Sequence, residues 1–232
     1  MRIAMWSGPR NLSTAMMYSF GARDDFVVMD EPFYAANLLH SGRDHPMREQ
    51  IIAAHESDPE RVSGLCRQEG APHRYMKHMP HHMLDGFPMD WAEDCKHVFL
   101  IRDPARVIAS YAAKTDLPTL EDIGLPQQLE LLERFDGFVI DSFDIRKDPE
   151  HMLRRLCTHL DIPFDPAMLT WPAGPKPFDG IWAAHWYDAV HRSTGFAGAE
   201  GPVPELTGAA AALNEKAQWY YKQLWDKAAG LI

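Results

Sequence analysis

Residues 7–14, with the sequence SGPRNLST, have the types and order of a site that binds a phosphate or sulfate group. They follow a short apolar segment and precede a segment with helical spacing. A helix N-terminus offers unpaired N–H groups and partial positive charge to an anion. Gly8 allows close backbone approach, Arg10 adds a forked cation, and Ser13 and Thr14 add hydroxyl donors. We predict an anion-binding loop made of Ser7, Gly8, Pro9, Arg10, Asn11, Leu12, Ser13 and Thr14.

The loop differs from the phosphate loop of kinases, which reads GxxxxGK[ST]. Counting from Gly8, Ser13 stands where the second Gly belongs and Thr14 where the Lys belongs. A later strand that could end in a magnesium-binding Asp ends in Arg102 instead. A metal-free phosphosulfate therefore suits the loop better than a nucleoside triphosphate with magnesium. An ordinary strand–helix turn with Ser13 as its N-cap is the alternative, and it leaves Arg10 without a role.

Short apolar segments alternate with helical ones, which predicts an α/β fold with a central parallel sheet between two layers of helices. Residues 163–204 are rich in Pro, Gly and Trp and are expected to be irregular. Strands are expected at residues 2–6, 26–29, 75–76 (as a strand end), 97–101 and 138–140, and helices at 13–23, 47–55, 61–69, 104–114, 126–135, 149–160 and 207–228.

Polar clusters follow four of these strands. They are residues 7–14, Asp30-Glu31, Lys77-His78 and Arg102-Asp103. Ligands of parallel sheets bind outside the carboxyl ends of the strands. The four clusters should therefore converge on one crevice.

Composition narrows the class of protein. The chain has 232 residues, a formal net charge of -10 and three widely spaced cysteines. The length predicts one domain over residues 1–232, in which we expect a core at 1–165 and a C-terminal lid or wrap at 166–232. The acidic balance argues against nucleic acid as a partner, and no segment has the roughly 20 apolar residues of a membrane span. The cysteine pattern and the absence of an apolar signal region predict a cytoplasmic protein.

Two segments resemble signatures of the sulfotransferase superfamily, whose donor is 3′-phosphoadenosine 5′-phosphosulfate (PAPS). Residues 7–14 are similar to its strand-end loop, [ST]xP[KR]SGTxxL. Arg102 ends a strand and Ser110 follows eight positions on, as in the second signature. The resemblance implies that Arg102 and Ser110 bind the donor's 3′-phosphate. It also implies a fold like that of the P-loop-containing nucleoside triphosphate hydrolases, and chemistry that needs no metal.

The resemblance covers roughly residues 1–165. Two stretches, SGPRNLSTAMMYSF and DEPFYA, are similar to a subgroup that includes sulfotransferase-like domains of plant proteins with aminotransferase-like names. The family's late Arg-Lys-Gly phosphate clamp has no clear counterpart, because FDGIW at 178–182 contains no basic pair.

Lys77-His78-Met79-Pro80 resembles the family's Lys-Thr-His-Leu-Pro, in which the His is the catalytic base. His78 is accordingly the first candidate base, and Glu31 is its rival. Arg10 and Lys77 are the expected cations for the departing phosphate. A metal site at His78, His81 and His82 is not expected, because their spacing puts at most two on one face of a turn.

The resemblance implies transfer of a sulfuryl group from PAPS to a hydroxyl or amine of a small-molecule acceptor. A phosphate-loop kinase acting on a small molecule and a noncatalytic nucleotide-binding protein are the alternatives. The C-terminal helix, with Trp219 and Trp225, is either core packing or the face of a homodimer.

Overall fold

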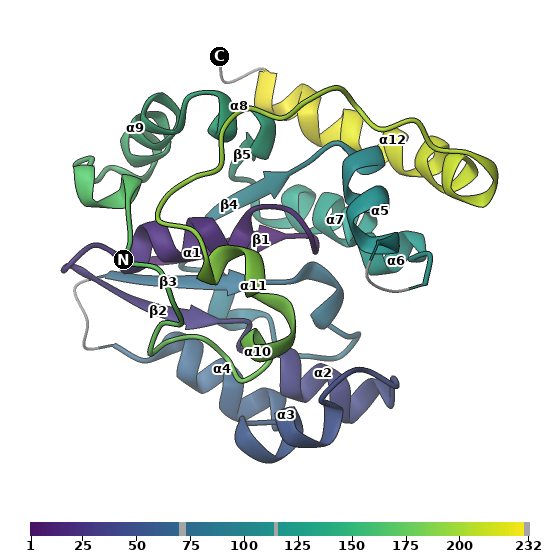
Figure 1. Cartoon of the computed structure of the whole chain (residues 1–232). Helices are drawn as coiled ribbons and strands as arrows, with labels where there is room; N and C mark the ends of the chain where they lie inside the picture. Colours follow the sequence, from purple (N-terminus) through teal and green to yellow (C-terminus); the bar gives the residue numbers. More distant parts are fainter. Residues whose placement is uncertain (70–72, 114–115, 230–232) are drawn as a thin grey trace.

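Five parallel strands form a single sheet in the order β2-β3-β1-β4-β5 (Figure 1). The computed structural model describes residues 1–69, 73–113 and 116–229. The strands are β1 (Arg2–Ser7), β2 (Phe26–Asp30), β3 (His73–His78), β4 (Lys96–Ile101) and β5 (Phe138–Asp141). Because all pairings are parallel, the carboxyl ends of the strands lie at the same edge. The expected parallel sheet is confirmed.

The central strand β1 shows why the sheet needs covering on both faces. It pairs with β3 on one side and β4 on the other, and Ile3 to Ser7 are all buried. A near-continuous apolar run is typical of a parallel strand buried on both faces. Alternate residues divide between two cores, with Met5 in one and Trp6 in the other.

Helices form a layer against each face of the sheet. On the Met5 face the core includes residues of α1 (Ser13–Gly21) and α9 (Pro149–Leu160), and on the Trp6 face residues of α4 (Pro59–Arg67), α7 (Leu125–Phe135) and α12 (Gly208–Ala229). The three-layer α/β/α arrangement is confirmed (Figure 1). The remaining helices are α2 (Tyr34–Ser41), α3 (Arg48–Ala54), α5 (Pro104–Ala112), α6 (Leu120–Ile123), α8 (Ser142–Lys147), α10 (Ala183–Trp186) and α11 (Asp188–His191), with single 3-10 turns at Pro80–His82, Asp90–Ala92 and Pro166–Leu169.

The segment between α9 and α12 crosses the molecule instead of forming a separate unit. Figure 1 shows its green trace passing in front of the sheet through α10 and α11, then past α8 to α12. An isolated antiparallel bridge joins Thr170 to Gly195 and fixes the middle of this path. The segment contains a 3-10 turn and the short helices α10 and α11, so the expectation of an irregular stretch was incomplete. Over the residues described, no helix combines the length and the apolar character needed to cross a membrane.

Gly8 is required by packing at the end of β1. A Cβ built on Gly8 lies 2.2 Å from the carbonyl oxygen of Ile123, at the end of α6. That oxygen belongs to backbone, so a side chain at residue 8 forces α6 away from the loop. The sequence assigned Gly8 to close approach by an anion, whereas the group that approaches it here is a carbonyl of the chain itself.

We expect Gly8→Ala to lower the free energy of unfolding by about 1–3 kcal/mol, because of this overlap with backbone. Gly64 is the matched control. It lies inside α4, and nothing lies within 4 Å of a Cβ built on it. Gly64→Ala should therefore raise the free energy of unfolding by up to about 1 kcal/mol. Urea denaturation measures both, and equal effects of the two substitutions contradict the explanation.

Candidate active site

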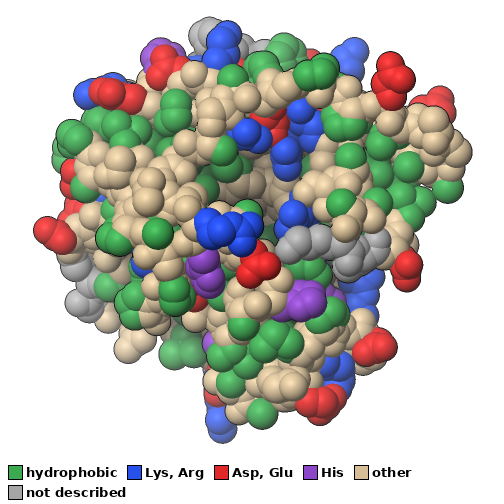
Figure 2. Space-filling model, in the orientation of Figure 1, with side chains coloured by type: hydrophobic (Ala, Val, Ile, Leu, Met, Phe, Trp, Pro, Cys, Tyr) green, Lys and Arg blue, Asp and Glu red, His purple; other side chains and the backbone are tan. Residues whose placement is uncertain are grey.

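A cavity of about 330 Å³ opens at the carboxyl ends of the strands. Figure 2 shows the hollow near the centre of the face, with Lys and Arg side chains above and below it. The anion loop, the ends of β2 and β3, α5 and the segment around α10 and α11 all contribute to its wall. Of the predicted site residues, those that line it are Pro9, Arg10, Asn11, Leu12, Ser13, Thr14, Glu31, Lys77, Arg102 and Ser110. Ser7, Gly8 and His78 do not.

The N-terminus of α1 faces this cavity without a side-chain cap. Leu12 is its N-cap residue in a left-handed conformation, and it makes no side-chain cap hydrogen bond. The two helices that follow β4 and β5 differ. Asp103 caps α5 and Asp141 caps α8 through their carboxylates. The N–H groups at the start of α1 are thus left for another acceptor.

Arg10, Ser110 and Arg102 meet beside these N–H groups. The Arg10 Nε donates to Ser110 Oγ at 3.0 Å, and Arg102 Nη1 donates to the carbonyl oxygen of Arg10 at 2.6 Å. Arg10 and Leu12 have φ values of 58° and 59°, so the loop backbone is strained at two non-glycine residues. Burial, and next the charge of Arg102, lower the pKa of Arg10. Two neighbouring guanidinium groups whose like charges repel favour the binding of an anion.

Two buried polar atoms of this region lack partners. Asn11 donates its amide to the carbonyl oxygen of Leu100 at 2.6 Å, but its Oδ1 has no hydrogen bond within the described parts of the chain. The same is true of Arg102 Nε. Buried groups of this kind are normally satisfied, so they indicate unmet bonding capacity in the wall of the cavity.

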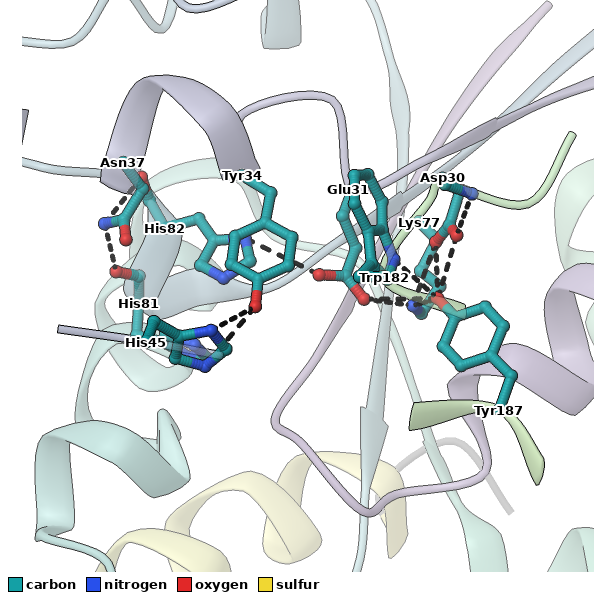
Figure 3. Close-up of polar contacts among 11 residues, drawn as sticks. Asp30, Glu31, Tyr34, Asn37, His45, Lys77, His81, His82, Trp182 and Tyr187 are labelled. Atoms are coloured by element: carbon teal, nitrogen blue, oxygen red, sulfur yellow. Dashed lines mark hydrogen bonds and ion pairs between the residues drawn. The ribbon is translucent and has the colours of Figure 1, made fainter. Parts of the chain in front are cut away.

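In the other half of the cavity, the ammonium group of Lys77 bonds to Asp30, Glu31 and Tyr187 (Figure 3). Its Nζ donates to Asp30 Oδ1 at 3.0 Å, to Tyr187 Oη at 2.6 Å and to Glu31 Oε1. Tyr187 donates in turn to Asp30 at 2.8 Å and accepts from Trp182 Nε1 at 3.1 Å. These bonds use the three donors of Lys77 and the bonding capacity of the Tyr187 hydroxyl.

The charges of the cluster are two carboxylates and one ammonium, all removed from water. Burial raises the pKa of Glu31 against the attraction of Lys77, and the neighbouring charge of Asp30 raises it further. Burial alone lowers the pKa of Lys77, but Asp30 and Glu31 together outweigh it, so that pKa is raised. Lys77 therefore carries its charge, and Glu31 takes a proton more readily than an exposed Glu does.

One carboxylate oxygen of Glu31, Oε2, takes no part in the hydrogen bonds of the Lys77 cluster. Oε1 accepts from Lys77, whereas Oε2 accepts no hydrogen bond within the described residues, and its near neighbour is His82 Nδ1 at 3.8 Å. The ring of Tyr34 stacks on His82 with centroids 4.5 Å apart. Glu31 has a φ of 42°, a strained conformation for a non-glycine residue at a strand end. The carboxylate is thus held by one oxygen and offers the other to the cavity.

His78 is not part of this site, and the expectation that it faces the crevice is wrong. The strand β3 continues through His78 instead of ending near Met76, so Lys77 and His78 point to opposite faces. His78 lies against Trp6 and Trp91, with centroids 4.8 and 4.6 Å apart. Burial lowers its pKa to about 3. Lys77 lines the cavity, whereas His78, the base that the resemblance implied, does not.

Sequence analysis placed Asp30 at the crevice beside Glu31 but gave it no role, and it assigned no role to His82 and only a place in the lid or wrap to Tyr187. Asp30 shares a strand end with Glu31, and that position was the available signal. Tyr187 lies in the segment expected to be irregular, where no periodicity indicated which side chains turn inward. Among the residues described, no group of three or more His, Cys, Asp or Glu could hold a metal ion.

A comparison with known protein families matches residues 1–228 to the sulfotransferase domain. The chain belongs to the sulfotransferase family. Two Arabidopsis thaliana proteins, branched-chain-amino-acid aminotransferase-like proteins 1 and 2, are each 39% identical to it over 201 residues. The match covers 84% of this chain but only 36% of each plant protein, so the chain spans about a third of their length. The predicted family, including the likeness to plant proteins with aminotransferase-like names, is confirmed.

Solved sulfotransferase structures share the fold. The sulfotransferase domain of the curacin biosynthetic pathway superposes with a TM-score of 0.56 at 16% identity, covering 96% of both chains. A mouse sulfotransferase complexed with PAP gives a TM-score of 0.52 at 14% identity, covering 98% of this chain and 84% of that one. These neighbours confirm the predicted P-loop-like sulfotransferase fold.

Removing the ammonium of Lys77 leaves two buried carboxylates without a counter-charge. We expect Lys77→Met to lower the free energy of unfolding by about 3–5 kcal/mol at pH 7.5. A carboxylate whose pKa is raised by folding stabilises the fold below its unfolded pKa, and that contribution is lost as the pH rises through the folded pKa. Glu31 has a raised pKa already, and loss of Lys77 raises it further. The variant should therefore lose less stability at pH 5 than at pH 7.5.

Urea denaturation at both pH values measures this difference. Lys96, exposed at the start of β4, provides the control, and Lys96→Met should change stability little at either pH. A Lys77→Met variant that is equally destabilised at pH 5 and 7.5 contradicts the assignment of uncompensated carboxylates.

Proposed function

We propose that this chain transfers a sulfuryl group from PAPS to a hydroxyl or amine of a small-molecule acceptor. One observation carries the proposal: a single cavity contains both an uncapped helix N-terminus flanked by Arg10 and Arg102 and a buried carboxylate with a free oxygen. Sulfuryl transfer needs an anion site and a base in the same cavity, with little covalent chemistry from the protein. Membership of the sulfotransferase family and the neighbour complexed with PAP support this assignment.

The residues at the start of α1 suit the 5′ end of the donor. Ser13 and Thr14 supply hydroxyl groups and N–H groups, and Arg10 supplies a guanidinium cation. The unpartnered Arg102 Nε and Asn11 Oδ1 fit a ligand that brings both acceptors and donors, as a nucleotide does. Arg102 and Ser110 are the proposed contacts of the 3′-phosphate.

Glu31 is the proposed base, acting through Oε2. The acceptor's O–H or N–H proton passes to this oxygen as the acceptor atom forms its bond to sulfur. The bond between sulfur and the bridging oxygen of the donor breaks, and its electron pair leaves with the nucleotide phosphate. The products are the sulfated acceptor and adenosine 3′,5′-bisphosphate. The aromatic side chains of Tyr34, Trp186 and Tyr187 line the cavity near Glu31 and suit an acceptor with apolar surface.

Lys77 takes a different role from the one expected of it. All three of its N–H donors are engaged by Asp30, Glu31 and Tyr187, so it has none to offer a departing phosphate. We assign Lys77 to positioning Glu31, and leave Arg10 as the cation for the leaving group.

Titration calorimetry with adenosine 3′,5′-bisphosphate tests the donor site. Arg102→Ala should weaken binding by about 1.5–3 kcal/mol, because charge-assisted hydrogen bonds are lost. Arg134, an exposed residue of α7 paired with Glu93, is the control, and Arg134→Ala should bind as the wild type does. Failure of the wild type to bind at millimolar nucleotide rejects the proposed donor.

A panel of phenols, alcohols and amines with ³⁵S-labelled PAPS tests the base. Glu31→Gln keeps the shape of the side chain but removes the proton acceptor, and should lower turnover by about 100-fold or more. It should leave affinity for the bisphosphate unchanged. His78→Phe is the informative comparison, because its ring lies in the apolar core and turnover should stay close to that of the wild type. The reverse result assigns the base to His78.

A further inference from the structure

Glu200 places a carboxylate among three arginines at the edge of the cavity. Its Oε1 accepts from Arg102 Nη2 and from Arg146 Nη1, the latter at 2.7 Å. Its Oε2 lies 3.0 Å from Arg106 Nε. The Glu200 side chain is 2% exposed, although the segment that carries it runs along the surface. The segment therefore buries its carboxylate against three guanidinium groups.

The same arginines hold the backbone on either side of Glu200. Arg146 Nε donates to the carbonyl oxygen of Gly198 at 2.8 Å, and Arg106 Nη2 donates to that of Gly201 at 2.6 Å. We call residues 196–207, which lead from the Gly195 bridge to α12, the strap. In Figure 1 this part of the chain runs past α8 toward α12. The arginines thus hold the strap through its backbone as well as through Glu200.

The cluster formed by Glu200 and its three arginines carries a net positive charge. Within the described residues, Glu200 is the one acidic group within ion-pair distance of Arg102, Arg106 and Arg146. Three guanidinium groups face one carboxylate, so the cluster holds two more positive charges than it neutralises. A phosphate monoester brings two negative charges and three acceptor oxygens, and its oxygens match the fork of a guanidinium.

Arg102 connects the cluster to the cavity. It lines the cavity, as do Gly195 and Ala197, which precede Glu200 in the same segment, whereas Glu200 is not among the lining residues. Its Nη1 bonds to the loop at Arg10 and its Nη2 to Glu200. An anion that enters from the cavity to bind Arg102 therefore meets the carboxylate of Glu200 on the same guanidinium.

We propose that Arg102, Arg106 and Arg146 form a phosphate site that Glu200 fills in this structure as an internal ligand. The 3′-phosphate of the donor binds there by displacing Glu200, and the displacement releases the strap. This inference rests on the proposed donor and adds two arginines and a competing carboxylate to its site. An internal ligand competes at a high effective concentration, so it lowers the apparent affinity for the phosphate. Glu200 thereby determines how strongly the 3′-phosphate contributes to binding.

The binding of two nucleotides distinguishes displacement of Glu200 from the proposal that PAPS is the donor. Adenosine 5′-monophosphate can bind only through the 5′ loop, whereas adenosine 3′,5′-bisphosphate also requires the arginine cluster. Glu200→Gln keeps the shape of the side chain and leaves the backbone bonds at Gly198 and Gly201 available, but removes the competing charge. We expect it to bind the bisphosphate about tenfold more tightly and the monophosphate as the wild type does.

Glu205 provides the matched control. It is an exposed acidic residue of the strap that makes no ion pair with another described residue. Glu205→Gln removes the same charge from the same segment, and should bind both nucleotides as the wild type does. Equal tightening in both variants assigns the effect to net charge and overturns the proposal.

Hydrogen exchange of the strap in the wild-type protein gives a readout that needs no substitution. Residues 196–207 should exchange faster when the bisphosphate is bound and unchanged with the monophosphate. If the monophosphate binds, but Glu200→Gln does not tighten the bisphosphate and the strap stays protected, the displacement is rejected and the 5′ site stands. If neither nucleotide binds the wild type or the variant, the donor proposal itself fails.

Discussion

The buried ammonium of Lys77 is the interaction on which the cavity depends. It joins β3 to the end of β2 through Asp30 and Glu31, and to the C-terminal segment through Tyr187. A charge fully removed from water is costly, and here two carboxylates and a hydroxyl offset that cost at one point. Because the cluster leaves Glu31 with one free oxygen, the arrangement that stabilises the fold also fixes the direction in which the carboxylate faces.

The anion loop is likewise joined by hydrogen bonds to a neighbouring strand, β4. Arg102, at the end of β4, donates to the backbone of Arg10, and Asn11 donates to the carbonyl oxygen of Leu100 on the same strand. The strained φ values of Arg10 and Leu12 are maintained by these bonds from outside the loop. The loop is therefore held open before a ligand arrives, and a preset site loses little conformational entropy on binding.

Local pattern was sufficient to predict the loop, Arg102 and the layered fold. Apolar runs followed by polar clusters identify strand ends, and the geometry of parallel sheets brings those ends together. Residues 9–14, Glu31 and Arg102 were placed at the cavity by this rule. The rule needs only the order of elements, which the sequence displays directly.

Orientation at single residues could not be predicted in the same way. Whether Lys77 or His78 faces the cavity depends on the register of β3, and a shift of one residue exchanges the two faces. Tyr187 and Glu200 reach the site through a long path without periodicity, fixed by the Thr170–Gly195 bridge and by arginines of other elements. Such contacts follow from the finished fold and leave no local signal.

The two halves of the cavity are closed by one continuous segment. Tyr187 binds the Lys77 cluster beside the proposed base, and Glu200 binds the arginine cluster that forms the proposed phosphate site. The Thr170–Gly195 bridge lies between them and holds the Tyr187 side in place. Release of Glu200 can therefore loosen the strap toward α12 while Tyr187 still positions Glu31. On this arrangement, donor entry changes the phosphate half of the cavity and leaves the base preset for the acceptor.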